Sequence, residues 1–523
     1  MSKNPITHSQ VADNTPIIIG AGQHVERLLP GAQPPFNSPV KLAAHAANAA
    51  LDSTQVAHLN REIDTIAFVR LFSDSSANWK SQFGGSNNLP ASLARLIGAP
   101  PEHRIYSNAG GTEPLTLLTE MAQAIARGEK SLTLIAGAEA IAYQKYARRN
   151  HLPDDWQEQF DISLDNREYR KRFACKEELS SGMTLPTHFY SLIENYQAHQ
   201  RGHNLEQHRQ FMAELFAPFS EVARDNPYAQ FTEAYTATQL ARVSDSNYPL
   251  TIPYTKPFVA RDSVNQSAAV LLCSAGKARS LGIAPAHWIF LQGLSARTDQ
   301  YLLQRPNPGS SEAMRQAIEN TLSMAQSKIS DIDLLDIYSC FPCAVTSVCD
   351  ILNLPKHGSP PLTITGGLPF FGGPGNNYAM HALAEMAIKL RQSNRRGLIT
   401  ANGGVLSKHA ALILSDLPHT PANNPIRWPL EEIHTTVEEQ GAGLPICSNP
   451  KSGTVITYTV IYNQNAADLG IVMGLTPNGE RFLASSVDQE ITQSMALANP
   501  IGRVVKTSTC DDKHSFTFSQ IQG

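Results

Sequence analysis

Strand-like and helix-like segments alternate along this chain, and that alternation restricts its possible folds more than any other feature. Residues 16–23 form a β-branched run closed by glycines, and residues 131–137 have the composition of a fully buried strand. Between them, residues 113–128 carry apolar side chains at helical spacing, with a proline near the start and a glycine at the end. This succession predicts a layered βαβ core.

A second α/β section follows later in the chain. We expect a strand at 288–293, a helix at 311–325, a strand at 334–338, a glycine-rich stretch opening a helix over 366–390, and a strand pair over 397–414. The same types of element therefore occur twice. This pattern indicates a structural duplication, although few residues repeat between the two sections.

The rest of the chain differs from these two sections. Residues 143–249 are rich in charge, aromatic rings and histidine, which favours a helical insertion. Residues 418–429 hold four prolines and are typical of a linker. The remainder alternates like strands, and Asn478-Gly479 is a hairpin signal. The predicted domains are 1–142 plus 250–278, the helical region 143–249, the second α/β half 279–420, and a β-domain at 424–523.

Composition excludes several classes of protein. A length of 523 residues predicts three or four domains, and 42% hydrophobic residues suffice for their cores. The formal charge of −4 with interspersed signs gives no reason to expect nucleic-acid binding. We expect no membrane span, since no apolar run reaches about 18 residues. The N-terminus lacks a signal-peptide pattern, and seven scattered cysteines do not form a disulfide framework, so we expect a soluble cytoplasmic protein without a metal site.

Several short motifs resemble those of thiolases, especially the sterol-carrier-type branch. They are Gly-Ala-Gly at 20–22, Gly-Ala-Glu at 137–139, Asn-Pro-Tyr-Ala-Gln at 226–230, Asp-Ile-Tyr-Ser-Cys-Phe at 336–341, Gly-Gly-Leu-Pro-Phe-Phe-Gly-Gly-Pro at 366–374 and Ala-Asn-Gly-Gly at 401–404. All stand in family order over residues 15–420. Each motif is weak alone, and their order makes the resemblance specific.

The extra C-terminal β-domain narrows the resemblance to the thiolase-like type 1 proteins, which carry an added domain similar to an OB-type barrel. Members of that group are named acetyl-CoA acetyltransferases. The resemblance implies a duplicated thiolase fold with an αβαβα five-layer core, a helical insertion and a C-terminal small β-barrel. It also implies a homodimer that takes a coenzyme A thioester as substrate or ligand, with no further cofactor.

The residue types that thiolases use for catalysis are missing from the matching positions of this chain. Thiolases use a cysteine nucleophile at a helix N-terminus, a histidine base and a second cysteine that shuttles a proton. Aligning the motifs places Gly111 at the nucleophile, Gly373 at the histidine, and Thr400 or Ala401 at the second cysteine. The two glycines could serve tight turns. They could equally leave room for a bulkier acyl group or a water molecule.

Three residues are candidates for catalysis in the altered site. Tyr338 replaces the family's active-site histidine or asparagine; it is a possible base if its pKa falls well below about 10, or else a core tyrosine at a strand end. His381 lies about one turn into the second glycine-opened helix and could reach the same pocket. Glu113 follows Gly111 by two positions, where it could cap the helix electrostatically or act as a base.

Other residues in the family turns are candidates for binding the substrate. Asn376 and Asn377 could face a thioester oxygen, or cap their helix. Lys408 and His409 could line the site, or be a solvated strand end. Cys340 and Cys343 form a C-x-x-C for which we favour a structural role. The full set of binding candidates is Asn108, Gly110, Gly111, Cys340, Phe341, Gly373, Asn376, Asn377, Asn402, Lys408 and His409.

The resemblance leaves three functions open. The first is an acyl-CoA-handling protein of acetyl-CoA acetyltransferase type, in which the missing catalytic set makes thiolysis unexpected. The second is a retro-aldolase-like enzyme that cleaves a β-hydroxyacyl-CoA with Tyr338. The third is a non-catalytic CoA-ester binding or scaffold protein. An enzyme using Tyr338 and His381 requires both side chains in one pocket, whereas the binding protein predicts a closed pocket or dispersed side chains.

Overall fold

The computed structural model describes residues 8–28, 36–75, 80–167, 173–418 and 443–519. Its main feature is a ten-stranded sheet with the order β5-β3-β2-β4-β6-β1-β7-β10-β9-β8. The strands of the first half are β1 (Pro16–Val25), β2 (Thr65–Phe68), β3 (His103–Tyr106), β4 (Leu132–Ala140), β5 (Asp165–Asn166) and β6 (Asn265–Ser274). Those of the second half are β7 (Ile289–Thr298), β8 (Leu334–Asp336), β9 (Arg396–Gly403) and β10 (Lys408–Ser415).

The two halves repeat one pairing pattern. In the first, β1 pairs antiparallel with β6, β6 antiparallel with β4, and β4 parallel with β2. In the second, β7 pairs antiparallel with β10, β10 antiparallel with β9, and β9 parallel with β8. Within the sheet, the halves join where Ile17 and Ile18 of β1 meet Phe290 and Ile289 of β7. The predicted duplication is therefore confirmed.

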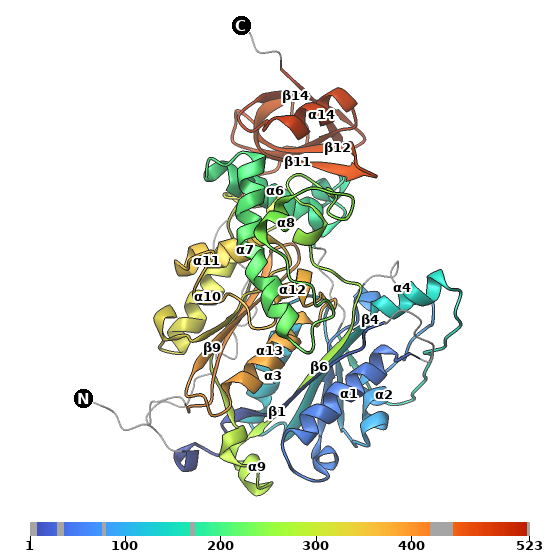
Figure 1. Cartoon of the computed structure of the whole chain (residues 1–523), viewed down its shortest axis with the longest axis vertical. Helices are drawn as coiled ribbons and strands as arrows, with labels where there is room; N and C mark the ends of the chain where they lie inside the picture. Colours follow the sequence, from blue (N-terminus) through green and yellow to red (C-terminus); the bar gives the residue numbers. More distant parts are fainter. Residues whose placement is uncertain (1–7, 29–35, 76–79, 168–172, 419–442, 520–523) are drawn as a thin grey trace, which may run out of the picture.

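Helices cover both faces of each half and form five layers with the strands (Figure 1). The outer layers are α1 (Pro39–Asp52) and α2 (Leu89–Ile97) on one side, and α10 (Glu312–Met324) and α11 (Pro342–Leu352) on the other. Between the half-sheets lie α3 (Glu113–Ala126) and α13 (Tyr378–Leu390), each in contact with both halves. Nearly all residues of these two helices are buried, as expected of apolar helices enclosed on all sides. The expected αβαβα core is confirmed.

Short helices complete the α/β part, and a helical region is inserted into its first half, before β6. The helices of that region are α4 (Ile141–Arg149), α5 (Lys176–Ser180), α6 (Pro186–Gln200), α7 (Leu205–Asp225) and α8 (Ala237–Ala241). The remaining short helices are α9 (Ala275–Ser280) and α12 (Gly367–Phe370). The strand β5 pairs parallel with β3 and forms one edge of the ten-stranded sheet. No helix in the described ranges is long and apolar enough to cross a membrane.

The C-terminal part is a closed five-stranded barrel, in the order β11-β12-β13-β15-β14. Its elements are β11 (Ser452–Asn463), β12 (Ala466–Leu475), β13 (Arg481–Ser486), α14 (Gln489–Leu497), β14 (Val504–Cys510) and β15 (Lys513–Phe518). The predicted hairpin joins β12 to β13, with Gly479 at a φ of 82°. The predicted small β-barrel is confirmed. The linker expected at 418–429 lies, beyond Pro418, outside the described residues.

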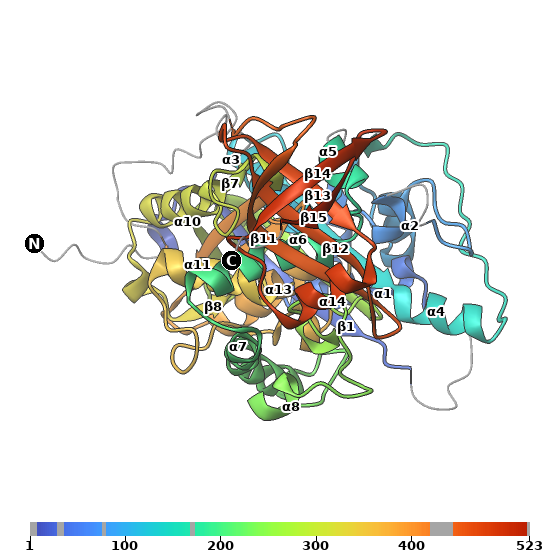
Figure 2. The ribbon, with the colours of Figure 1, turned by 90° about the horizontal axis from the view of Figure 1, so that it is seen from above.

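The barrel packs on α6 and lies over it when the molecule is seen from above (Figure 2). Buried hydrogen bonds join the two. The side-chain amide of Asn195 on α6 donates to the carbonyl oxygens of Tyr458 on β11 and of Ile252, both at 2.8 Å. The Thr457 hydroxyl donates to Leu192 O at 2.6 Å, and Ile252 N donates to Val460 O at 2.9 Å. Because buried polar groups are costly to leave unpaired, these bonds fix the barrel against the helical region.

Candidate functional site

Two glycine turns meet at the N-terminal end of α3, where the family nucleophile is expected. The first turn contains Gly110 and Gly111 just before Glu113, and the second contains Gly403 at the end of β9. A side-chain carbon at Gly403 would lie only 3.0 Å from the backbone nitrogen of Gly111. The two turns thus pack backbone against backbone.

The space beside Gly111 is filled. A side-chain carbon there would overlap the Tyr338 hydroxyl and the Asn402 carbonyl oxygen, and would lie 2.9 Å from Tyr338 Cζ. Real Cβ atoms do not approach other atoms so closely, so no side chain fits at position 111 without movement. The interpretation that the glycines leave room for an acyl group is therefore wrong at Gly111, because the Tyr338 ring occupies that room.

Gly373, at the position of the thiolase histidine, has little more space for a side chain than Gly111. A side-chain carbon at Gly373 would lie 3.3 Å from the Arg261 carbonyl oxygen and 3.5 Å from Ala260 Cβ. The backbone nitrogen of Gly373 donates to the same Arg261 oxygen at 2.8 Å. Segment 260–261 therefore lies where a larger side chain at 373 would extend.

Gly110 is less tightly enclosed than Gly111. Its φ of 147° is one that L-residues rarely adopt. A carbon atom at its Cβ position would be in ordinary contact with three polar atoms: Lys408 Nζ at 3.6 Å, Thr112 Oγ1 at 3.8 Å and Glu113 Oε1 at 3.9 Å. Gly110 and Lys408 are both partly exposed, whereas Gly111 is buried. The exposed part of this turn is thus displaced by one residue from the expected nucleophile.

Glu113 and Lys408 are the charged groups of this turn. Glu113 is 8% exposed, and burial raises the pKa of its carboxyl, while the nearby positive charges of Lys408 and Arg167 act in the opposite direction. Lys408 Nζ donates to Ala109 O at 3.3 Å. The structure brings these two predicted candidates together with Gly110.

Tyr338 comes directly after β8 and its ring lies between the two half-sheets. Its backbone nitrogen donates to Thr400 Oγ1 at 3.1 Å, and its ring meets Tyr378 of α13 edge-on at 5.3 Å between centroids. Burial raises the pKa of the Tyr338 phenol far above its ordinary value. Tyr338 is therefore a neutral hydrogen-bond donor near pH 7 and a poor base.

His381 has different neighbours from Tyr338. Its Nδ1 lies 2.8 Å from Gln23 Oε1 on β1, and Gln23 Nε2 donates to Glu385 Oε2 at 2.7 Å. Its ring also meets Phe371 at 5.1 Å. Nε2 of His381 is buried without a partner among the described residues. His381 and Tyr338 therefore do not share hydrogen-bond partners, and the predicted convergence on one pocket is not observed.

The buried ring of His381 leads to a pH prediction. Burial lowers its pKa from 6.5 to about 3, so the folded protein resists protonation there. Its contribution to stability is complete above pH 6.5 and is lost as the pH falls toward 3. We expect nuclear magnetic resonance to show a neutral His381 ring at pH 5, with the proton on Nδ1, which donates to Gln23. Protonation of His381 near pH 6.5 in the folded protein would contradict this.

The two asparagines before α13 have separate roles. Asn376 Oδ1 accepts from Gly110 N at 3.0 Å, and Asn376 Nδ2 donates to Arg70 O and Ser75 Oγ at 2.9 and 3.0 Å. Asn377 occupies the N-cap position but its side chain does not cap the helix. That side chain lies against Gly137, and neither of its amide atoms has a partner in the described structure. The capping interpretation is therefore wrong for Asn377, and Asn376 positions the Gly110 turn.

Cys340, Phe341 and Asn402 form a contact group near Tyr338. Asn402 Oδ1 accepts from Tyr190 OH at 3.0 Å and from Cys340 Sγ at 3.6 Å. Phe341 stacks on Tyr190 at 4.1 Å between centroids. Burial raises the pKa of the Cys340 thiol to about 11, so this sulfur remains protonated and is a weak nucleophile.

His409 lies away from the Gly110 turn. Its Nε2 contacts Ser311 Oγ at 2.9 Å and Leu406 O at 3.0 Å, and the Ser311 hydroxyl also contacts Asp299 Oδ2 at 2.6 Å. Burial lowers the pKa of His409 to about 4. Of the two neighbouring candidates on β10, the structure brings Lys408 to the turn and buries His409 in a separate hydrogen-bonded group.

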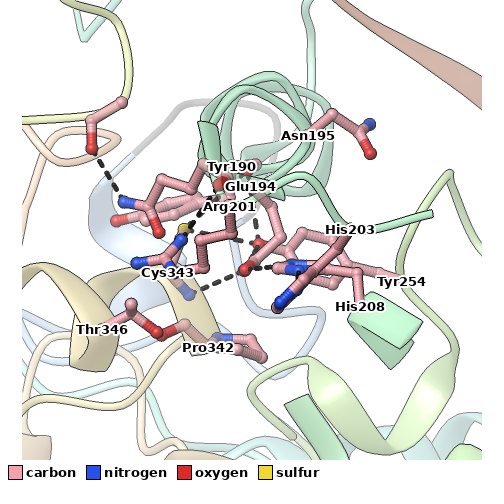
Figure 3. Close-up of polar contacts among 12 residues, drawn as sticks. Tyr190, Glu194, Asn195, Arg201, His203, His208, Tyr254, Pro342, Cys343 and Thr346 are labelled. Atoms are coloured by element: carbon pink, nitrogen blue, oxygen red, sulfur yellow. Dashed lines mark hydrogen bonds and ion pairs between the residues drawn. The ribbon is translucent and has the colours of Figure 1, made fainter. Parts of the chain in front are cut away.

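A buried polar network that the sequence did not indicate ties α6 to α11 (Figure 3). Glu194 of α6 is 0% exposed. Its Oε2 accepts from Tyr254 OH and from the backbone nitrogen of Cys343, both at 2.7 Å, and its Oε1 lies 2.8 Å from His208 Nε2. His208 Nδ1 lies 3.3 Å from His203 Nδ1. Glu194 thus satisfies the N-terminus of α11, which no local side chain caps.

The five layers, the paired half-sheets and the two facing glycine turns define a thiolase-type fold. A crystal structure of a monomeric SCP2-thiolase-like protein type 1 from Mycobacterium smegmatis is 32% identical in sequence and matches with a TM-score of 0.81. The match covers 97% of this chain and 100% of that one. The chain belongs to the family of SCP2-thiolase-like proteins type 1. Since that relative is described as monomeric, the homodimer expected here stays a prediction.

Other similarities agree with this assignment. Residues 433–512 match the additional C-terminal domain of thiolase-like protein type 1. An acetyl-CoA acetyltransferase from Syntrophomonas wolfei is 16% identical with a TM-score of 0.54, over 77% of this chain and 100% of that one. The human mitochondrial 3-ketoacyl-CoA thiolase has the same identity and score, over 77% and 99%. These two show the fold alone. No curated protein sequence matches the chain.

Proposed function

We propose that this protein binds an acyl-CoA thioester at the Gly110 turn and does not catalyse thiolysis. The observation that carries this proposal is the contact between Gly111 and Tyr338. Because the phenol and the Asn402 carbonyl fill the space beside Gly111, no side chain can act as a covalent nucleophile from this position. Gly110, in contrast, is partly exposed and has Lys408 Nζ nearby.

The chemistry of nearby thiols supports the absence of thiolysis. Cys340 stays protonated at its contact with Asn402. Cys343 is fully buried, and burial together with the negative charge of Glu194 raises the pKa of its thiol well above the ordinary value. Thiolysis requires a thiolate that the substrate can reach, and neither cysteine meets that condition.

The charges beside Gly110 support a CoA thioester as ligand. Lys408 presents an ammonium group to the turn, and Arg167 lies close enough to affect Glu113 electrostatically. Cations of this kind suit the phosphates or the thioester oxygen of such a ligand. Proteins with this fold include enzymes named for acetyl-CoA and 3-ketoacyl-CoA. Retro-aldol cleavage with Tyr338 as base is not supported, because burial keeps that phenol protonated.

A titration of the full-length protein tests the proposal. We expect isothermal titration calorimetry to detect binding of acetyl-CoA, butyryl-CoA or acetoacetyl-CoA to the wild-type protein. Lys408→Met should weaken that binding about tenfold, equivalent to about 1.4 kcal/mol. Lys451→Met on the barrel is the matched control and should bind like wild type. Acetoacetyl-CoA incubated with free CoA should not be cleaved. Absence of binding by all three thioesters, or CoA-dependent cleavage, would overturn the proposal.

A further inference from the structure

A cavity of about 110 Å³ lies where the barrel meets the turn between α6 and α7. Its walls come from both parts of the chain: Asn195, His203 and His208 on the helical side, and Tyr458 with residues 496–499 on the barrel side. No carboxylate, lysine or arginine is among the described residues that line it. The cavity is therefore an uncharged part of the junction, and its two imidazoles are the groups that can gain a charge near neutral pH.

The buried Glu194 fixes the order of hydrogen bonds through these two imidazoles (Figure 3). His208 Nε2 lies 2.8 Å from Glu194 Oε1, and a carboxylate only accepts hydrogen bonds, so His208 donates from Nε2. The other nitrogen of a neutral His208, Nδ1, is then the acceptor in its 3.3 Å contact with His203 Nδ1. His203 therefore carries its hydrogen on Nδ1, and its Nε2 is the nitrogen that can take a further proton.

A second proton on His203 would place a positive charge close to other positive groups. Partial burial, and then the charges of His208 on α7 and of Arg201 at the end of α6, lower the pKa of His203 from its ordinary value of 6.5. Asp350 of α11 pairs with Arg201 at 2.9 Å, and Glu194 is bonded to His208 rather than to His203. The carboxylates nearest to this chain are thus engaged by other side chains.

The barrel side of the cavity is neutral as well. Tyr458 is its titratable residue, and burial raises the pKa of that phenol, which therefore stays protonated. Residues 496–499 are Ala-Leu-Ala-Asn at the end of α14, and their leucine is 89% exposed. The hydrogen bonds that Asn195 and Thr457 make between α6 and the barrel involve no titratable group. Segment 496–499 can therefore move away from a charged imidazole while the rest of the barrel stays attached.

We propose that His203 is a proton-sensitive contact that loosens the end of α14 from the helical region in acid. Neutral His203 fits the uncharged cavity, whereas the protonated ring favours an opening that admits water to the imidazolium. The open form regains the ordinary pKa of about 6.5, and the closed form has a lower one. Closure is therefore fully favoured above pH 6.5 and weakens as the pH falls below it, by at most about tenfold per pH unit for one proton.

Amide hydrogen exchange of the full-length protein without ligand tests this proposal. Exchange is measured at pH 7.5 and pH 5.5 and corrected for the intrinsic rate at each pH. We expect the protection factors at Leu497 and Ala498 to fall by about two- to tenfold at pH 5.5. The Ile252 amide, which donates to Val460 O of the barrel at 2.9 Å, should keep its protection, because its bond does not depend on the cavity.

Two variants assign the effect to one imidazole. His203→Gln should abolish the pH dependence, because glutamine keeps a donor for His208 Nδ1 and does not titrate. His199→Gln changes an exposed histidine on α6 and should keep the wild-type behaviour.

Three results would overturn the proposal: equal protection at both pH values in wild type, an equal fall at Ile252, or a fall that persists in His203→Gln. If His203→Gln does not fold, the ring resonances of His203 are titrated in the wild-type protein instead. We then expect a pKa below 6.5, and a value of 6.5 or higher would also overturn the proposal.

Discussion

Replacing Gly111 by alanine is expected to destabilise this protein strongly, by about 1–3 kcal/mol in the free energy of unfolding. The added carbon would overlap the Tyr338 hydroxyl and the Asn402 carbonyl oxygen. Asn402 is part of β9, where it pairs with His409 of β10, so its backbone cannot move without disturbing the sheet. Restoring the family cysteine by Gly111→Cys should cost at least as much and should not restore thiolysis.

Two other glycines provide graded controls, measured by urea denaturation. Gly85→Ala adds a carbon with no atom within 4 Å and should change stability by less than about 0.5 kcal/mol. Gly373→Ala meets the Arg261 carbonyl oxygen at 3.3 Å and should fall between the other two. Tyr338→Phe should not rescue Gly111→Ala, since the Asn402 oxygen and the ring carbon remain. A Gly111→Ala protein as stable as wild type would show that Tyr338 does not fill the site in solution.

The fold was largely predictable because its signals are local. A buried strand such as β4 is apolar on both faces, and helices such as α3 carry their own terminal signals of proline and glycine. The motifs fix the order of these elements, and the duplicated pairing then follows from that order. The sequence did not predict strand β5 or helix α14. The edge strand β5 pairs through two residues only, and α14 is a short helix in a strand-rich domain, so neither leaves a clear periodic pattern.

The site was less predictable because it depends on side-chain directions across the interior. The motifs placed Gly111 and Tyr338 near each other, but only the structure shows that the phenol occupies the place of the nucleophile. Likewise, α13 lies between the half-sheets, so its side chains can reach either half. Tyr378 OH donates to Asp336 of β8, whereas His381, three residues later, contacts Gln23 on β1. Spacing along a helix does not reveal which sheet each side chain faces.

Glu194 is an example of a residue without any sequence signal. It lies on a helix that mixes polar with apolar and aromatic residues, so a solvated glutamate is the ordinary interpretation. Its partners Tyr254, His208 and Cys343 come from three different segments. Such a network becomes visible only after the chain has folded, since each partner is more than ten positions away.

Removing this carboxylate is expected to be the most destabilising change outside the glycine turns. Glu194→Ala removes the acceptor of His208 Nε2 and of the Cys343 backbone nitrogen in a fully buried location. It leaves the Tyr254 hydroxyl, among the bonds described, with only its longer contacts to Tyr190 O at 3.3 Å and to Cys343 Sγ at 3.4 Å. Each buried donor left without an acceptor costs about 1–3 kcal/mol. Helix α6 also holds the barrel and the Tyr190 contact to Asn402. The loss of stability should therefore extend to the barrel and to the end of β9.

Two measurements test this expectation. Urea denaturation should show the full loss for Glu194→Ala and a smaller one for Glu194→Gln, which keeps an oxygen acceptor. It should show almost none for Glu214→Ala, which changes an exposed glutamate on α7 that accepts from Gln210. Hydrogen exchange should then show lost protection at the Cys343 amide in Glu194→Ala. If the amide stays protected and stability falls by less than about 1 kcal/mol, α11 does not depend on Glu194. Its packing against α6, α7 and α10 would then suffice to hold its first turn.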